Sequence, residues 1–191
     1  MSSAMSGAGY FLVEALFTLA TFAVLMRFVL QAVRADFYNP ISQAIVRITD
    51  PVLRPLRKIL PSTGGLDLAA LLVAIALQLL LLLLVFRGLS PVTGFLVASF
   101  RLLTLVLDLY FWALILIVIL SWVAPGSRHP GAALLYQVTE PLLAPFRRLI
   151  PPVGGLDFSV MVVFLVLVVV REYLVPGLAA EAGIQIGRAH V

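Results

Sequence analysis

"TDPVLRPLRKILPSTGGLD" occupies residues 49–67, and "TEPLLAPFRRLIPPVGGLD" occupies residues 139–157. The two stretches align without a gap at an offset of 90 residues, and 10 of their 19 positions are identical. Internal repetition of this kind indicates a chain built from two similar structural units. The repeat therefore divides the chain into two halves, each with one proline-rich, basic connector.

The composition is that of a membrane protein. Of the 191 residues, 62% are hydrophobic and 12% are charged, whereas a soluble domain has about 45–50% apolar and about 25% charged residues. The basic residues are too few and too scattered for a nucleic-acid surface, so the pI near 10.0 indicates topology signals and contacts with anionic lipid headgroups. The absence of cysteine excludes disulfides, thiolate metal ligands and a covalent haem motif.

Four segments are long and apolar enough to cross a bilayer, which takes about 20 mostly apolar residues. They lie at about 10–33, 66–86, 102–124 and 156–176. No basic residue precedes the first segment, so we expect an uncleaved span there and not a signal peptide. We predict an all-α membrane protein with four transmembrane helices.

The four spans form two tandem repeats, residues 1–90 and 91–178, each a helical hairpin around its connector. Because each repeat contains two spans, the second copy enters the membrane in the same direction as the first, and the repeats are parallel. Residues 179–191 form a tail, and its end, "IGRAHV" at 186–191, resembles a translated sequencing adapter. We expect that end to be an artefact.

The distribution of basic residues predicts the topology. The two connectors carry eight basic residues, and the loop between the second and third spans is flanked by two, Arg87 and Arg101. The positive-inside rule then places the connectors in the cytoplasm and both termini in the periplasm. The connector residues are Arg34, Arg47, Arg54, Arg57, Lys58, Arg128, Arg147 and Arg148.

The prolines predict that each connector helix is broken. Asp50 and Glu140 directly precede a proline, and Thr49 and Thr139 precede them, which is a pattern typical of a helix start. A similar Asn39-Pro40 pair predicts a short helix at about 40–48. Pro55 and Pro145, four residues after the first proline of each motif, predict a bend or a restart, because proline removes a backbone bond and clashes with the preceding turn.

Between the breaks the connectors are amphipathic, which favours a location in the headgroup layer. The apolar residues of the first copy can share one face, and the basic residues point elsewhere. Candidate contacts for lipid, an anion or a partner protein are Arg54, Arg57, Lys58, Arg147 and Arg148.

Each motif ends in "GGLD". The pairs Gly64-Gly65 and Gly154-Gly155 permit a sharp turn, and Asp67 and Asp157 are placed to cap the helix that follows. A structural interpretation is that the chain lies on the surface, turns and enters the membrane. The alternative is a site in which the two glycine turns face each other and Arg57 and Arg147 flank an anion.

Ionisable residues within spans are candidates for function because their burial is unfavourable. We expect Arg27 to extend to the headgroups, Asp108 to pair with Arg101 or Arg27, and Gln78 to hydrogen-bond a neighbouring helix. His129, in the place of Asn39, is expected to be a turn residue. No catalytic set, phosphate-binding loop or metal-ligand spacing is present, so we predict neither an enzyme nor a cofactor.

The stretch "RADFYNPISQAIVRITDPVLRPLRKILP…GGLD" at 34–67 and its second copy resemble the two repeats of the YggT family. The resemblance extends to about residue 176. The second copy departs from the first: Ala144 replaces Arg54, and His129-Pro130-Gly131 replaces the Asn-Pro-Ile start.

The resemblance implies a small integral protein of the bacterial cytoplasmic membrane. It also implies roles associated with the family: osmotic tolerance with ion uptake, envelope organisation, or haem attachment to a plastid cytochrome.

Three interpretations of the function follow. The first is a non-enzymatic scaffold or assembly factor, and the few polar residues in the spans favour it. The second is a small ion channel or transporter for cation uptake. The third, a cofactor or cytochrome assembly helper, is weakest because cysteines and intramembrane histidines are lacking. The expected partners are the bilayer, a second copy of the chain or another membrane protein, but not nucleic acid.

Overall fold

The computed structural model describes residues 2–62, 64–86, 89–150 and 157–183, and every regular element in these ranges is helical. The first half contains α1 (Ser2–Ala32), α2 (Pro40–Arg57) and α3 (Leu68–Val85). The second half contains α4 (Pro91–Val123), α5 (Pro130–Leu149) and a last helix in three consecutive parts, α6 (Phe158–Val169), the π-helical turn η1 (Val170–Leu174) and α7 (Val175–Glu181).

Within the described ranges, four helical stretches have the length and composition to cross a membrane. They are Gly7–Ala32, Leu68–Val85, Pro91–Val123 and Phe158–Glu181. The order is therefore long helix, connector helix, long helix, repeated once. The expectation of an all-α protein with four spans in two repeated hairpins is confirmed.

The third and fourth spans differ in length from the sequence expectation. Helix α4 begins at Pro91 and not near residue 102, because the Ser90 hydroxyl accepts a hydrogen bond from Thr93 N–H and Pro91 occupies the first turn. The last helix continues to Glu181, through η1. Pro176 follows this π turn, and the wider turn relieves the clash that a proline ring makes with the preceding turn of an α-helix.

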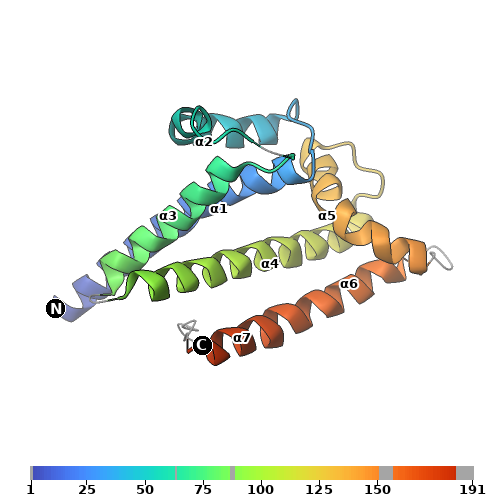
Figure 1. The fold of residues 1–191 in the computed structure, drawn as a ribbon. Helices are drawn as coiled ribbons and strands as arrows, with labels where there is room; N and C mark the ends of the chain where they lie inside the picture. The colour runs from blue at the N-terminus through green and yellow to red at the C-terminus, as the bar shows by residue number, and fades with distance from the viewer. Residues whose placement is uncertain (1, 63, 87–88, 151–156, 184–191) are drawn as a thin grey trace.

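The long helices form two hairpins, shown in Figure 1. Helices α1 and α3 pack together, α4 packs on α6 and α7, and α3 lies against α4 to join the hairpins. Helix α2 lies across one end of the α1–α3 hairpin, and α5 lies across the corresponding end of the α4–α6 pair. The two connector helices are therefore on the same side of the molecule.

Each connector helix is continuous through its prolines, so of the two predicted alternatives the bend is confirmed and the restart is wrong. Pro51 and Pro55 lie inside α2, and Pro141 and Pro145 lie inside α5. In Figure 1 both helices change direction along their length, as expected for internal prolines. Packing against the long helices offsets the unfavourable prolines, since Leu53 of α2 is fully buried.

Because the connector helices are continuous, the predicted helix starts within them are wrong. The Thr49 and Thr139 hydroxyls donate to Ile45 O and Leu135 O in their own helices. The true starts lie upstream. The Asn39 side chain accepts from Ile41 N–H at the start of α2, and the His129 side chain accepts from Gly131 N–H at the start of α5.

Three apolar clusters hold the helices together. One joins α1, α2, α3 and α4 around Leu53 and Ala70, one joins α1, α4 and α5 around Leu30, and one joins α4, α5 and α6 around Leu114 and Leu143. Every cluster therefore includes residues of a connector helix. The connectors are consequently part of the core at their end of the molecule, and not loose surface segments.

Candidate functional site

The first connector closes on itself through charged side chains that we name the first ion cluster: Asp50, Arg57 and Asp67. The Arg57 guanidinium pairs with both Asp67 carboxylate oxygens, and its Nη1 lies 3.5 Å from Asp50 Oδ1. The Asp67 carboxylate also accepts a hydrogen bond from Ala70 N–H at 3.2 Å, as the N-cap of α3. This one carboxylate therefore links the end of α2 to the start of the second span.

The second connector repeats the arrangement in the second ion cluster: Glu140, Arg147 and Asp157. Arg147 Nε lies 2.8 Å from Asp157 Oδ2, and its Nη1 pairs with Glu140. Asp157 is the N-cap of α6 and accepts from Ser159 N–H at 3.0 Å. The two clusters thus occupy equivalent positions in the two repeats.

The second ion cluster stabilises the charged forms of its members. Partial burial acts to raise the pKa of the Asp157 carboxyl, but the hydrogen bond and charge of Arg147, with the bonds from Ser159, together hold that pKa below its usual value. Burial likewise acts to lower the pKa of Arg147, and its bonds to Asp157 and Glu140 outweigh burial and raise it. Both groups are therefore ionised at neutral pH.

The sequence predicted Arg57 and Arg147 as contact residues and Asp67 and Asp157 as helix caps, but it did not predict that these side chains pair. Asp50 and Glu140 lie seven residues before the arginine of their repeat, and Asp67 and Asp157 lie ten residues after it. This repeated spacing was the signal that could have revealed the clusters. It was missed because Asp50 and Glu140 were interpreted as residues at a helix start.

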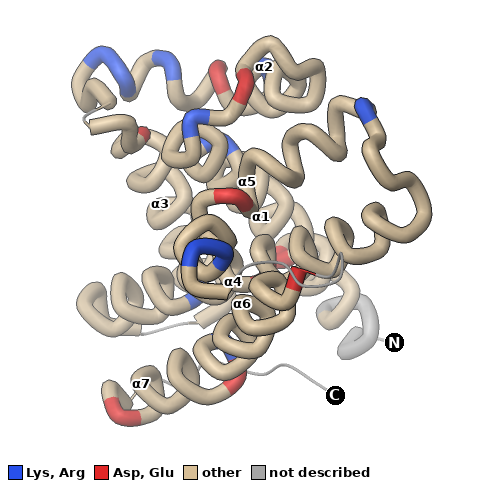
Figure 2. Tube along the Cα trace, turned by 90° about the vertical axis from the view of Figure 1, so that its right-hand side faces the viewer, with Lys and Arg blue, Asp and Glu red and all other residues tan. Residues whose placement is uncertain are grey.

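The remaining basic candidates lie at the protein surface. Arg54 is 80% exposed, and its Nη2 forms an ion pair with Asp50 Oδ2 at 3.7 Å. Lys58 and Arg148 are also exposed. Several of these residues line a shallow groove on α2. Figure 2 shows the basic residues along this helix. The groove is lined by Arg47, Asp50, Pro51, Arg54, Pro55 and Lys58.

The glycine turns are described in one repeat only. Gly64 and Gly65 have φ angles of 64° and 88°, which side chains other than glycine rarely adopt. Gly154 and Gly155 lie outside the described residues, and so the suggestion that the two turns face each other stays a prediction.

Two polar contacts lie between the long helices. Gln78 of α3 donates from Nε2 to Thr21 Oγ1 of α1 at 3.2 Å, which joins the first hairpin. Asp108 of α4 pairs with Arg171 of η1, and not with Arg101 or Arg27 as expected. The difference arises because α4 begins at Pro91, so Asp108 lies in mid-helix opposite the last span.

Arg171 is the centre of a small intramembrane group. Its guanidinium lies 4.6 Å from the centroid of the Phe111 ring, and its Nη1 lies 3.0 Å from Glu172. The sequence did not reveal Arg171 as the partner of Asp108, because this pairing depends on how α4 packs against the last helix.

Arg27 does not extend to the headgroups, which corrects the sequence expectation. Its side chain is 9% exposed and lies beneath α2, with the guanidinium carbon 4.8 Å from the centroid of the Phe37 ring. The nitrogens Nε and Nη1 are buried and have no hydrogen-bond partner among the residues that the structure describes. The α2 helix covers the end of α1 and therefore shields most of this side chain.

The two repeats also contact each other at the connector side. Asn39 Nδ2 donates to Pro130 O at 2.8 Å, and Asp36 N–H donates to the Gln137 side-chain oxygen at 2.8 Å. In the part of the chain that the structure describes, no group of three or more acidic or histidine side chains is arranged to hold a metal ion.

Comparison with known proteins agrees with this repeated architecture. Residues 6–87 and 96–178 both match the CCB3/YggT family. A Pseudomonas aeruginosa protein, "Uncharacterized protein PA0392", is 47% identical over 185 residues, which cover 94% of each chain. "Uncharacterized protein YggT" of Escherichia coli K12 is 38% identical over 84% of this chain and 86% of its own.

A Vibrio alginolyticus protein encoded 3′ of proC is 45% identical over 81% of this chain and 86% of its own. No solved structure matches the chain. The family match covers both hairpins with their connectors, and the relatives extend over most of the sequence. The chain therefore belongs to the CCB3/YggT family.

Proposed function

We propose that this protein is a non-enzymatic scaffold or assembly factor of the bacterial cytoplasmic membrane, acting in envelope organisation or the response to osmotic stress. The observation that carries the proposal is the division of charge between the two sides of α2. The arginine that faces the long helices, Arg57, is held by two carboxylates. Arg54 and Lys58 are exposed on the outer side of α2, where a partner can reach them, and Arg54 makes only a 3.7 Å surface ion pair with Asp50.

The connectors supply what a scaffold needs. They are fixed on the long helices by the ion clusters and by the buried Leu53 and Leu143. A rigid helix that lies across the end of a hairpin presents its outer side chains in a constant arrangement. The partner is then another membrane protein or a second copy of the chain, recognised beside anionic headgroups. The positive-inside bias places this surface in the cytoplasm and both termini in the periplasm.

A second candidate function rests on Asp108 and Arg171. Charged pairs within membrane spans often mark the path of an ion or proton. In cation uptake, the ion would bind to the Asp108 carboxylate. Arg171 would pair with that carboxylate when no ion is bound. Asp108 and Arg171 are 32% and 26% exposed at the surface of the helices.

One experiment separates the two functions. Potassium and sodium flux are measured in proteoliposomes with the wild-type protein, Asp108→Asn and an Arg54→Gln/Lys58→Gln double variant. We expect no flux above that of empty liposomes in any sample. Flux that disappears in Asp108→Asn alone would overturn the scaffold and establish a transporter.

A companion assay tests the scaffold directly. A strain that lacks the gene is grown at high osmolarity and complemented with each variant. The scaffold predicts that the Arg54→Gln/Lys58→Gln protein inserts normally but fails to complement, while Asp108→Asn complements. Full complementation by the double variant would contradict a role for the outer surface of α2.

A further inference from the structure

Arg27 is an unusual residue because it is buried without full compensation. Two of its three guanidinium nitrogens have no hydrogen-bond partner within the described part of the chain, and the residue is 9% exposed. Buried polar groups in proteins are nearly always hydrogen-bonded, and an exception needs an explanation. The face of the Phe37 ring stabilises the cation, but it supplies no acceptor for the N–H groups.

The guanidinium lies at a cavity between α1 and α2. The cavity has a volume of about 330 Å³ and is lined by Arg27, Phe37, Gln43, Val46 and Arg47. Arg47 is exposed, and no ion pair involves it among the described residues. Two arginines and a side-chain amide therefore meet at one cavity whose lining contains no acidic residue.

The surrounding charges leave this region positive. The charged groups that act on Arg27 electrostatically are Arg57, Asp50 and Asp67. With Arg27 and Arg47, these groups carry three positive and two negative charges, so the net charge is +1. Since Arg57 is held by Asp50 and Asp67, the positive charge is concentrated on the two arginines at the cavity.

The depth of the cavity indicates the kind of ligand. Arg27 lies five residues before the end of α1 at Ala32, which is about 7.5 Å along a helix. The connector helix α2 lies above it, so the cavity is near the boundary between headgroups and acyl chains. The neighbouring Phe37 and Val46 offer apolar surface to the glycerol and the first methylenes of a lipid.

We propose that this cavity binds the phosphate group of an anionic membrane phospholipid. Arginine pairs with phosphate through two parallel N–H···O bonds, and phosphate oxygens would supply the acceptors that Arg27 lacks. Arg47 would contact the same headgroup from α2, and Gln43 would donate to it. Basic pockets beside transmembrane helices are a known mode of headgroup binding.

The site belongs to one repeat only. At the 90-residue offset, Ile117 replaces Arg27, Ser127 replaces Phe37 and Gln137 replaces Arg47. The second repeat thus has neither the buried cation nor its companion arginine. We therefore expect one such site in each chain, at the side of the first connector.

The test is a lipid titration followed by native mass spectrometry of the delipidated protein in detergent. Phosphatidylglycerol is the probe, with phosphatidylcholine and inorganic phosphate in separate arms. The variants are Arg27→Met and Arg47→Gln, and Arg148→Gln, an exposed arginine of the second connector, is the matched control. Thermal unfolding of each variant confirms that it is folded.

We expect one phosphatidylglycerol molecule to bind more tightly than all later ones. Arg27→Met weakens this first event at least about tenfold, Arg47→Gln weakens it about fivefold, and Arg148→Gln leaves it unchanged. Phosphatidylcholine, which has no net charge, binds more weakly than phosphatidylglycerol to the wild-type protein.

Equal affinity of the wild type, Arg27→Met and Arg47→Gln for phosphatidylglycerol would overturn the proposal. Equal binding of the two lipids by the wild type would overturn the preference for an anionic headgroup. If inorganic phosphate alone discriminates between the wild type and Arg27→Met, the ligand is soluble phosphate and the lipid assignment is wrong.

Discussion

Asp67 has no exposed surface, yet it is an acidic residue at the N-terminus of α3, where the connector leads into the second long helix. Its carboxylate meets Arg57 on one side and Ala70 N–H on the other. A buried charge is stable only when its partners satisfy it, and removal of one partner leaves the other uncompensated. The equivalent Asp157 is 30% exposed, so water partly solvates its carboxylate.

The two aspartates therefore differ in their contribution to stability. Asparagine retains the capping ability of aspartate but not its charge, so Asp67→Asn isolates the pair with Arg57. We expect a loss of about 1.5–3 kcal/mol in the free energy of unfolding, measured by SDS titration of the detergent-solubilised protein. Asp157→Asn is the matched control, with a loss below about 1 kcal/mol. Equal losses would contradict the difference in burial.

Asp157 also gives the stability a pH dependence. Its pKa is lowered in the folded protein, so the Arg147–Asp157 pair stabilises the fold above the unfolded pKa, near about 3.9. That contribution is lost as the pH falls from this value through the lower folded pKa. Compared with Asp157→Asn, the wild-type melting temperature should fall more steeply below about pH 4. Parallel pH profiles would count against the pair.

At the scale of elements, the two connector helices begin alike but are not equally anchored. Asn39 caps α2 and also donates to Pro130 O of the second repeat. His129 caps α5 through Nδ1 and is exposed. The residue at this position thus caps its own helix in both repeats. In the first repeat it also connects that helix to the second repeat.

Substituting each of the two cap residues by alanine measures how differently they anchor their helices. We expect Asn39→Ala to lower the free energy of unfolding by about 2 kcal/mol, because it removes a cap and a buried hydrogen bond. His129→Ala should lower it by less than about 1 kcal/mol. Both are read from the same SDS titration, and a larger effect at His129 would refute the connecting function of Asn39.

The caps show what sequence can predict at this scale. Asn39-Pro40 and the aspartate after each glycine pair predict helix starts because a cap depends only on neighbouring residues. Asp50-Pro51 has the same local signal, yet α2 continues through it, since burial of Leu53 and the pairing of Arg57 outweigh the proline. Long-range packing therefore overrides the local signal here.

The partners of charged residues were the least predictable part. Asp108 meets Arg171 because α4 is longer than its apolar core suggests and the last helix contains a π turn. Neither feature follows from hydropathy. The position of Arg27 was mispredicted for a similar reason. An arginine near a span end usually extends to the headgroups, but α2 covers that end of α1.

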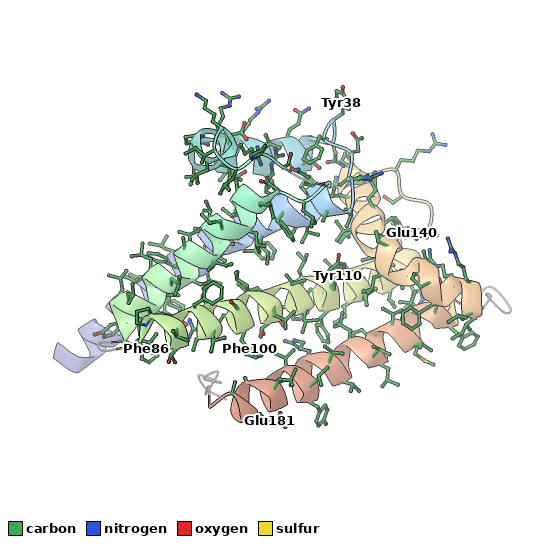
Figure 3. All side chains as sticks on the ribbon, viewed as in Figure 1. Tyr38, Phe86, Phe100, Tyr110, Glu140 and Glu181 are labelled. Carbon is green, nitrogen blue, oxygen red and sulfur yellow. The ribbon has the colours of Figure 1, made fainter. Side chains whose placement is uncertain are left out.

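The whole molecule has two distinct ends, and the absence of cysteine makes their sidedness testable. Tyr38, which is 89% exposed, and Phe86 mark opposite ends in Figure 3. Ser62 lies at the connector end and Ser90 lies between α3 and α4, and both are exposed. Single cysteines at these two positions would report the orientation.

We expect a membrane-impermeant maleimide to label Ser90→Cys in intact spheroplasts, and Ser62→Cys only after permeabilisation. This follows from the excess of basic residues in the connectors. Labelling with detergent present is the control that both cysteines are reactive. The reverse pattern would place the connectors and the outer surface of α2 in the periplasm.

The short separations within the ion clusters have a consequence for biosynthesis. Arg57 is seven residues from Asp50 and ten from Asp67, so little chain entropy is lost when the first cluster forms. All three residues precede the second connector in the chain, and Arg147 repeats the pattern in the second half. The first hairpin can thus fix the angle of its returning helix before the second connector has left the ribosome, because its cluster uses no residue of the second repeat.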